Sequence, residues 1–179
     1  PLAHRALHDV SKGRPENSRA AIEAAIAAGY GIEIDVQMSA DSQAMVFHDH
    51  ALDRLTYDAG AVRLRTAEAL GQIPLRGGAE GIPDLPEVLS LVRGRVPLLI
   101  EIKDQDGAMG PNVGPLEAAV AEALARYRGP AAVMSFNPYS VAKMANLLPD
   151  MPRGLVTSAY EYSEWPLPNA VCDHLRGIP

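Results

Sequence analysis

The sequence predicts an α/β protein built as a TIM-type (β/α)8 barrel that is incomplete in this chain. Short apolar segments alternate with helical segments, a pattern typical of a parallel sheet or barrel. Six segments suit strands, two fewer than such a barrel needs, and the 179 residues fall short of the roughly 250 that the fold takes. We therefore expect a single domain over residues 1–179 from which the last two strands are missing.

Two of the expected helices have local start or stop signals. The first helix is capped by Asn17 or Ser18 and stops at Gly29. The second is started by Asp84, with Pro86 well placed in the first turn. Strands are expected at 2–6, 31–38, 44–48, 96–103, 131–136 and 154–157, and the helices after the first at 84–92, 115–127 and 139–148.

The link between the second and third strands, residues 39–43, is too short for a helix. If it closes as a tight hairpin about Asp41 and Ser42, Asp35 falls opposite His48 and the two share a face. If the strands are parallel instead, both motifs lie at strand C-termini. Either geometry brings His48 close to the charges that end the second strand.

A long insertion, at about residues 51–83, follows the third strand. Loops of this length in a compact domain are usually functional. We therefore expect the insertion to contribute to a site rather than to serve as a plain connection.

Composition excludes several kinds of partner. The net charge of −6 argues against nucleic acid and anionic membranes. No apolar run approaches the ~20 residues of a transmembrane segment, and the single cysteine, Cys172, excludes an internal disulfide framework.

With no signal peptide, we expect a cytoplasmic protein. Because the chain begins with Pro1, a periplasmic or secreted protein is not excluded, and the oligomeric state is left open.

Two charged pairs end the second and fourth strands. Glu33 and Asp35 are two residues apart, as are Glu101 and Lys103, so each pair points to one face of its strand. Carboxylates in this arrangement bind a hard divalent cation, Mg²⁺ or Ca²⁺, through oxygen. The alternative is a set of ion pairs in which Arg5 and Lys103 neutralise the acids.

His4 and His48 are the candidate acid/base groups, because histidine titrates near neutrality and both follow short apolar segments. The commoner role of a lone histidine is a hydrogen-bonded structural one. We expect His8, His50 and His174 to lie in loops or on the surface.

Arg5 and Lys103 suit the phosphate of an anionic substrate, as a bidentate fork and a point charge. Outside this group, Glu16 and Asn17 are expected to act in helix capping, and Arg54 to pair with Asp53 in a loop. For Tyr160 and Trp165 the sequence does not decide between the core and a pocket.

In this order and spacing the motifs resemble the glycerophosphodiester phosphodiesterase family over roughly the first two-thirds of the chain, and Val133-Met134-Ser135-Phe136 resembles its fifth strand. The motifs are His4-Arg5, Pro15-Glu16-Asn17-Ser18, Gly29, Glu33-Ile34-Asp35-Val36, Val46-Phe47-His48-Asp49, Leu52-Asp53-Arg54-Leu55-Thr56, Ile82-Pro83-Asp84-Leu85 and Glu101-Ile102-Lys103.

The resemblance implies a TIM-type barrel with a small insertion after the third strand, and a metal-dependent enzyme that hydrolyses small glycerophosphodiesters to glycerol 3-phosphate and an alcohol. The implied roles are metal ligation by Glu33, Asp35 and Glu101, acid/base catalysis by His4 and His48, and phosphate binding by Arg5 and Lys103. The attacker is either water or the glycerol 2-hydroxyl, and which histidine is the acid stays open.

The chain departs from the family pattern in three places. Ala6 replaces the usual glycine after His-Arg and is expected to narrow the pocket floor. The turn at 39–42 lacks the usual lysine and glycine, and the last two strands have no counterpart.

Two other functions stay open. One is a lysophospholipase D-type phosphodiesterase on the same scaffold, and the other is a barrel that binds phosphate without catalysis.

Overall fold

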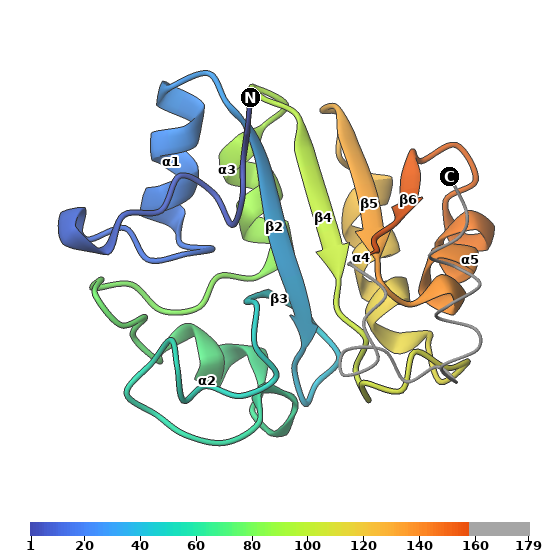
Figure 1. Cartoon of the computed structure of the whole chain (residues 1–179), viewed down its shortest axis with the longest axis horizontal. Coiled ribbons are helices and arrows are strands. Elements are labelled where there is room, and N and C mark those ends of the chain that lie inside the picture. Colours follow the sequence, from blue (N-terminus) through green and yellow to red (C-terminus); the bar gives the residue numbers. More distant parts are fainter. Residues whose placement is uncertain (158–179) are drawn as a thin grey trace.

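The computed structural model of the protein describes residues 1–157, and the structural statements below concern this part of the chain (Figure 1). A six-stranded sheet has the order β1-β2-β4-β5-β6, all parallel, with β3 paired antiparallel to β2. The strands are β1 (Leu2–Ala3), β2 (Gly31–Met38), β3 (Ala44–Val46), β4 (Leu98–Ile102), β5 (Ala131–Ser135) and β6 (Arg153–Leu155).

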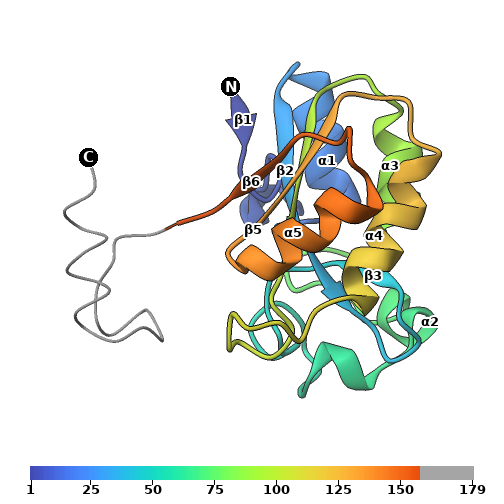
Figure 2. The same ribbon diagram turned by 90° about the vertical axis from the view of Figure 1, so that its right-hand side faces the viewer.

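A layer of α-helices covers one face of the sheet, as Figure 2 shows from the side. Its members contact one another in chain order: α1 (Arg19–Ala27), α3 (Leu85–Val92), α4 (Pro115–Ala125) and α5 (Pro138–Leu147). The short α2 (Ala67–Gly71) and the 3-10 helices η1 (Val10–Lys12) and η2 (Val62–Leu64) complete the list. None of the helices in residues 1–157 has the length and apolar character needed to cross a bilayer.

The sheet does not close on itself within residues 1–157, where β1 and β6 end the strand order and β3 pairs with β2 alone. Parallel strands joined by helices on one face are the construction of a barrel wall. The expected alternation of strand and helix is therefore confirmed, and the six expected strands are all present.

Residue alternation along the central strands separates an apolar core from a polar face. Alternate apolar side chains of both strands are buried in the main core against the helix layer. They are Ile32, Ile34 and Val36 on β2, and Leu98, Ile100 and Ile102 on β4. Successive side chains of a strand point to opposite faces, so Glu33, Asp35 and Glu101 lie on the other face of the sheet. That face, opposite the helices, holds the charged groups.

The first strand is shorter than expected. We expected it over 2–6, but it ends at Ala3, because Arg5 and Ala6 adopt left-handed backbone with φ of 52° and 63°. The other expected elements are present with ends shifted by up to two residues. Ser18 caps α1 by accepting a hydrogen bond from the Ala21 N–H, and Asp84 caps α3 in the same way.

Of the two geometries left open, the structure has the hairpin between β2 and β3, with a register one residue away from that of a tight turn about Asp41 and Ser42. Val36 pairs with Val46, and the Phe47 N–H donates to the Asp35 carbonyl at 3.0 Å, so Phe47 and not His48 lies opposite Asp35. The turn is longer than a tight two-residue turn, because the Ser39 N–H bonds the Gln43 carbonyl at 3.0 Å. One added loop residue shifts every pair by one position.

A second, small apolar core packs the insertion between β3 and α3 against β3 itself. Its buried members are Met45, Phe47, Leu52, Val62, Leu70, Ile73, Leu75 and Ile82. The insertion is tied to the helix layer through Glu80, whose carboxylate accepts the backbone N–H groups of Arg19 and Ala20 at 2.9 and 3.0 Å. These N–H groups open α1 and have no acceptor inside the helix.

The small core predicts different stability effects for two leucines of the insertion. Leu70 is fully buried, whereas Leu64 is 70% exposed. We expect Leu70→Ala to lower the free energy of unfolding by about 2–5 kcal/mol, and Leu64→Ala to change it by less than about 0.5 kcal/mol. Urea unfolding of both variants tests this, and equal effects would contradict a packed insertion.

Candidate active site

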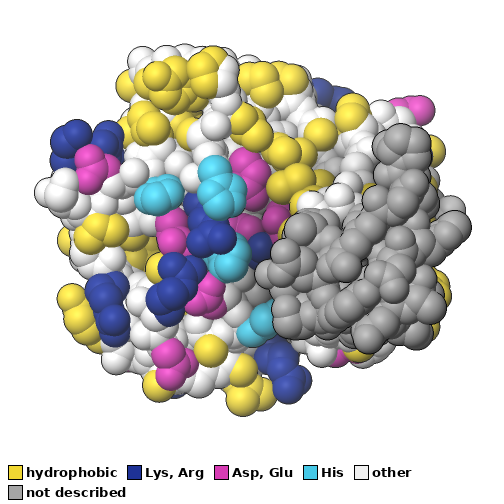
Figure 3. All heavy atoms as spheres, viewed as in Figure 1, with side chains coloured by type: hydrophobic (Ala, Val, Ile, Leu, Met, Phe, Trp, Pro, Cys, Tyr) yellow, Lys and Arg dark blue, Asp and Glu magenta, His cyan; other side chains and the backbone are white. Residues whose placement is uncertain are grey.

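Three carboxylates meet on the polar face of the sheet. Asp35 on β2 lies beside Glu101 on β4 in the parallel register of the two strands, and Glu33 precedes Asp35 on the same face. One oxygen from each of the three lies within 4.8 Å of the others, and all three residues are buried. Figure 3 shows acidic, basic and histidine side chains gathered in the middle of this face.

Of the three carboxylates, Glu33 is the least favourable to bury in its charged form. Its Oε2 accepts the Arg5 backbone N–H at 2.8 Å, but its Oε1 is buried without a hydrogen-bond partner in the described part of the chain. Burial raises the pKa of Glu33 to about 7, and the charges of Asp35 and Glu101 add to this rise. The structure therefore leaves one carboxylate oxygen that a cation can still satisfy.

Lys103 neutralises part of the cluster. Its Nζ lies 2.7 Å from Asp35 Oδ1 and 2.5 Å from Glu101 Oε1, and its side chain is 14% exposed. The ion-pair alternative therefore describes Lys103 as it lies here. It does not account for Glu33, because neither Lys103 nor the Arg5 guanidinium bonds Oε1. Among residues 1–157, the cluster thus combines carboxylates paired with Lys103 and one carboxylate oxygen, Glu33 Oε1, that has no hydrogen-bond partner.

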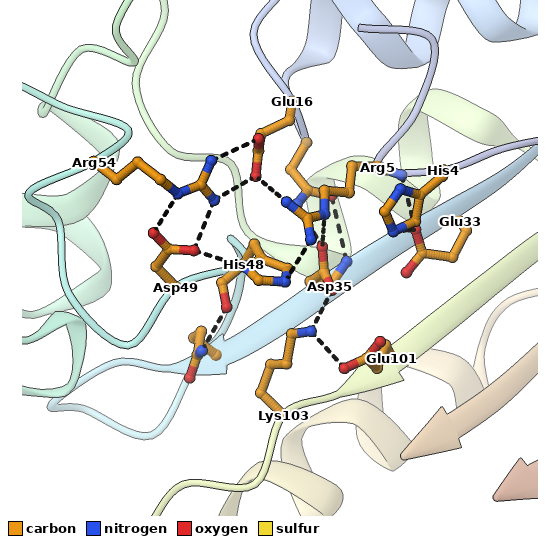
Figure 4. A network of polar contacts seen from close by, with 12 residues as sticks. His4, Arg5, Glu16, Glu33, Asp35, His48, Asp49, Arg54, Glu101 and Lys103 are labelled. Carbon is orange, nitrogen blue, oxygen red and sulfur yellow. Dashed lines mark hydrogen bonds and ion pairs between the residues drawn. The ribbon is translucent and has the colours of Figure 1, made fainter. Parts of the chain in front are cut away.

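His4 lies over Glu33, with Nε2 4.0 Å from Glu33 Oε2 and its side chain 72% exposed (Figure 4). The left-handed backbone at Arg5 turns the chain after His4, and the Arg5 guanidinium lies beside Asp35, with Nε 3.8 Å from Oδ2. Ala6 does not narrow the pocket floor as expected, since it is 2% exposed and packs in the main core.

His48 lies on the other side of Arg5. Its Nδ1 is 2.6 Å from Asp49 Oδ1, and its Nε2 is 2.7 Å from Arg5 Nη2. An arginine N–H can only donate, so Nε2 is the acceptor and Nδ1 carries the proton that Asp49 accepts. His48 is therefore neutral in this arrangement, with one defined tautomer.

Two residues of the site were missed because they were given only a capping role. The Asn17 amide donates to Asp35 Oδ2 at 2.9 Å, and Asn17 Oδ1 accepts the Asp35 backbone N–H at 3.3 Å. Glu16 accepts hydrogen bonds from Arg5 and from Arg54. The cap itself is Ser18. Because Ser18 alone caps the helix, Glu16 and Asn17 are not needed for capping. Two polar residues without a capping role were the signal in the sequence that they belong to the site.

The expected partner of Arg54 was wrong. Arg54 bonds Asp49 and Glu16, whereas Asp53 accepts the Gly60 N–H at 3.1 Å. Nothing local in the sequence joins Arg54 to Glu16, which lies 38 residues earlier.

A pocket of about 390 Å³ opens beside Glu101 and Lys103. His48 and Asp49 form part of its wall, and Met109 and Phe136 add apolar surface. It has room for a small organic molecule next to the charged groups.

The remaining histidines were expected to lie in loops or on the surface, and Tyr160 and Trp165 were left open between the core and a pocket. His8 and His50 are exposed, in agreement with the expectation. The expectations for Tyr160, Trp165 and His174 fall outside the described residues.

Sequence comparisons point to one family. Residues 4–177 match the model of the glycerophosphoryl diester phosphodiesterase family. A glycerophosphodiester phosphodiesterase of Caldanaerobacter subterraneus is 31% identical over 174 residues, which cover 92% of this chain and 69% of that protein. The Bacillus subtilis protein YhdW is 32% identical over 166 residues, 87% of this chain and 65% of its own length. The chain thus spans about two thirds of the curated relatives it matches.

Solved structures agree with this result. A phosphodiesterase of Oleispira antarctica, in complex with the product sn-glycerol-3-phosphate, superposes with a TM-score of 0.77 at 27% identity, covering 98% of this chain and 71% of that one. The glycerophosphodiester phosphodiesterase of Agrobacterium tumefaciens gives 0.71 at 27% identity, with 85% and 64% covered. The wall of strands and helices therefore matches the TIM-barrel fold of these enzymes over most of the chain.

The buried Glu33 predicts an unusual dependence of stability on pH. In chelator, the folded state binds one more proton than the unfolded state between pH 4.5 and about 7, so the free energy of unfolding falls as pH rises through this range. We expect Glu33→Gln to be more stable than wild type in chelator at about pH 8, by about 1–3 kcal/mol. Added Mg²⁺ or Ca²⁺ should stabilise wild type more than this variant.

Urea unfolding with and without cation measures both effects. Glu23→Gln, at an exposed position of α1, is the matched control and should behave as wild type. A Glu33→Gln variant no more stable than wild type in chelator would contradict the buried charge.

Proposed function

Since the chain belongs to the glycerophosphoryl diester phosphodiesterase family, we propose that it hydrolyses glycerophosphodiesters to glycerol 3-phosphate and an alcohol with the help of a divalent cation. The observation that carries the proposal is the convergence of three buried carboxylates with two histidines and an arginine on one face of the sheet. The product found in the Oleispira antarctica relative supports the substrate class.

The residues present fit a hard divalent cation. Glu33, Asp35 and Glu101 offer only oxygen ligands within 4.8 Å of one another, which suits Mg²⁺ or Ca²⁺. The buried Glu33 Oε1 has no partner among the described residues, and a ligand role would give it one. When bound, such a cation would neutralise phosphate charge and stabilise the charge that builds on its oxygens.

Arg5 and Lys103 would hold the phosphate. The Arg5 guanidinium makes two hydrogen bonds in the described part of the chain, to Glu16 and His48, and arginine has five N–H donors. Donors therefore remain for phosphate oxygens. Lys103, in the wall of the pocket, supplies a second positive charge next to the carboxylates.

His48 and His4 would move the protons. The neutral His48 has its lone pair on Nε2, so we assign it the role of base toward the attacking water or glycerol 2-hydroxyl. Attack by the 2-hydroxyl would form a cyclic phosphate, which water then opens. His4 lies on the other side of Arg5, and we assign it the role of acid that protonates the leaving alcohol (Figure 4). Each role contributes about 10²–10⁴ in rate.

The proposal predicts turnover that depends on a cation and on named side chains. The whole protein should release glycerol 3-phosphate from glycerophosphocholine, and chelator should abolish this release. We expect Glu33→Ala, His4→Ala and His48→Ala each to lower kcat by about 10²–10⁴. The exposed Glu23→Ala and His8→Ala serve as matched controls with unchanged kcat.

Four outcomes would contradict parts of this scheme. Full activity of Glu33→Ala would contradict the cation ligand, and activity retained in both histidine variants would contradict acid/base catalysis. Hydrolysis of lysophosphatidylcholine in preference to glycerophosphocholine would favour the lysophospholipase D type. Cation binding without turnover of either substrate would favour a phosphate-binding barrel.

A further inference from the structure

Five side chains form a closed ring of hydrogen bonds next to the carboxylate cluster (Figure 4). Arg54 donates to Asp49 and to Glu16, Asp49 accepts from His48, and Arg5 joins His48 to Glu16. Arg54 Nε lies 2.7 Å from Asp49 Oδ2 and Arg54 Nη2 lies 2.7 Å from Asp49 Oδ1, while Nη1 and Nη2 lie 3.0 Å from Glu16 Oε2 and 2.9 Å from Glu16 Oε1. His48 Nδ1 lies 2.6 Å from Asp49 Oδ1. Arg5 Nη2 lies 2.7 Å from His48 Nε2, and Arg5 Nη1 lies 3.1 Å from Glu16 Oε1.

Arg54 makes four of the seven hydrogen bonds of the ring. It grips both oxygens of Asp49 and both oxygens of Glu16, so one planar guanidinium fixes two carboxylates at once. An exposed single ion pair contributes little, but bidentate forks add geometric specificity. The hydrogen bond from Arg54 also lowers the pKa of Asp49 to about 2, so Asp49 is always an acceptor at neutral pH.

The two carboxylates that Arg54 fixes, Asp49 and Glu16, in turn position His48 and Arg5. Asp49 accepts the Nδ1 proton of His48, which leaves Nε2 as the lone-pair atom toward Arg5. Glu16 holds Arg5 Nη1, while the Arg5 Nε lies 3.8 Å from Asp35. Arg54 itself contacts none of Glu33, Asp35 and Glu101, and its side chain is 49% exposed.

We propose that Arg54 is a positioning residue: through Asp49 it holds His48 in the Nδ1–H tautomer, and through Glu16 it holds the Arg5 guanidinium over the carboxylate cluster. This inference rests on the proposed function, and it gives the insertion an indirect part in the reaction, through Asp49 and Glu16. Displacements of about 1 Å in reacting groups lower rates by up to about 10²-fold, so a residue that acts only through others has a measurable effect.

The simpler alternative is that Arg54 only fastens the insertion to the rest of the chain. Arg76 provides the matched control. It belongs to the same insertion, stacks on Tyr57 with its guanidinium 5.0 Å from the ring centre, and donates to the Thr56 carbonyl at 2.6 Å. In the described residues, its contacts stay within the insertion and reach none of the ring.

The experiment compares Arg54→Ala with Arg76→Ala in the whole protein. We expect Arg54→Ala to lower kcat for glycerophosphocholine about 10- to 100-fold, and Arg76→Ala to leave it within about twofold of wild type. Guanidinium chloride at a non-denaturing concentration should restore part of kcat in Arg54→Ala only. Arg54→Lys keeps the charge but not the two forks, so its kcat should resemble that of Arg54→Ala.

A second readout does not require turnover. Nitrogen-15 NMR at about pH 8, above the usual pKa of histidine, should show His48 as the Nδ1–H tautomer in wild type and as a mixture in Arg54→Ala and Arg54→Lys. An unchanged tautomer together with kcat equal to that of Arg76→Ala would overturn the proposal. If wild type shows no turnover, the proposed function fails, and an unchanged tautomer in the Arg54 variants would then overturn the positioning role on its own.

Discussion

Three like charges buried within 4.8 Å of one another are the constraint on which the polar face of this protein depends. They are adjacent because parallel strands place Asp35 directly beside Glu101, and because residue alternation puts Glu33 on the same face. Such a cluster is unfavourable unless other groups compensate it. Lys103, the Asn17 amide and the Arg5 backbone N–H each come from a different segment and each bond a carboxylate of the cluster.

The chain accepts backbone strain to bring these partners in. Arg5 and Ala6 have φ of 52° and 63°, a left-handed conformation that is strained for such residues, whereas Asn17, with φ of 58°, belongs to a residue type that adopts it readily. The Asn17 N–H donates to the Arg5 carbonyl at 3.0 Å, so the two left-handed segments support each other. Burial of the Ala6 side chain in the main core further offsets the strain. Strain of this kind clusters at functional sites because the surrounding structure holds residues there against their local preference.

The insertion after β3 contributes a further charged side chain, Arg54, to the polar face of the sheet. Its apolar side chains pack in a small core together with Met45 of β3, and Glu80 fixes it to the start of α1. Arg54 can therefore reach Asp49 and Glu16 with defined geometry, although its side chain is half exposed. If Arg54 lay in a flexible loop, forming the same contacts would cost the full rotamer entropy of its side chain.

The sequence alone determined the features that depend on neighbours along the chain. Two-residue spacing at Glu33 and Asp35 decides which face they share, and Ser18 and Asp84 carry the signals that start helices. From these patterns and the family resemblance, seven residues of the candidate site could be named, and the structure brings all seven together (Figure 4). Glu16 and Asn17 were missed, because their partners lie far away in the sequence. The chemical roles of the seven residues stay predictions.

Only the tertiary structure decided which distant groups meet. The register of His48 depended on one loop residue, and the Arg54–Glu16 pair joins residues 38 positions apart. The position of Lys103 between Asp35 and Glu101 depended on which strands are neighbours. The physical reason is that local pattern selects the conformation and the exposed face of each element, whereas contacts between charged side chains depend on how those elements pack. Many partners of opposite charge are compatible with the sequence, and packing brings only a few within hydrogen-bond distance.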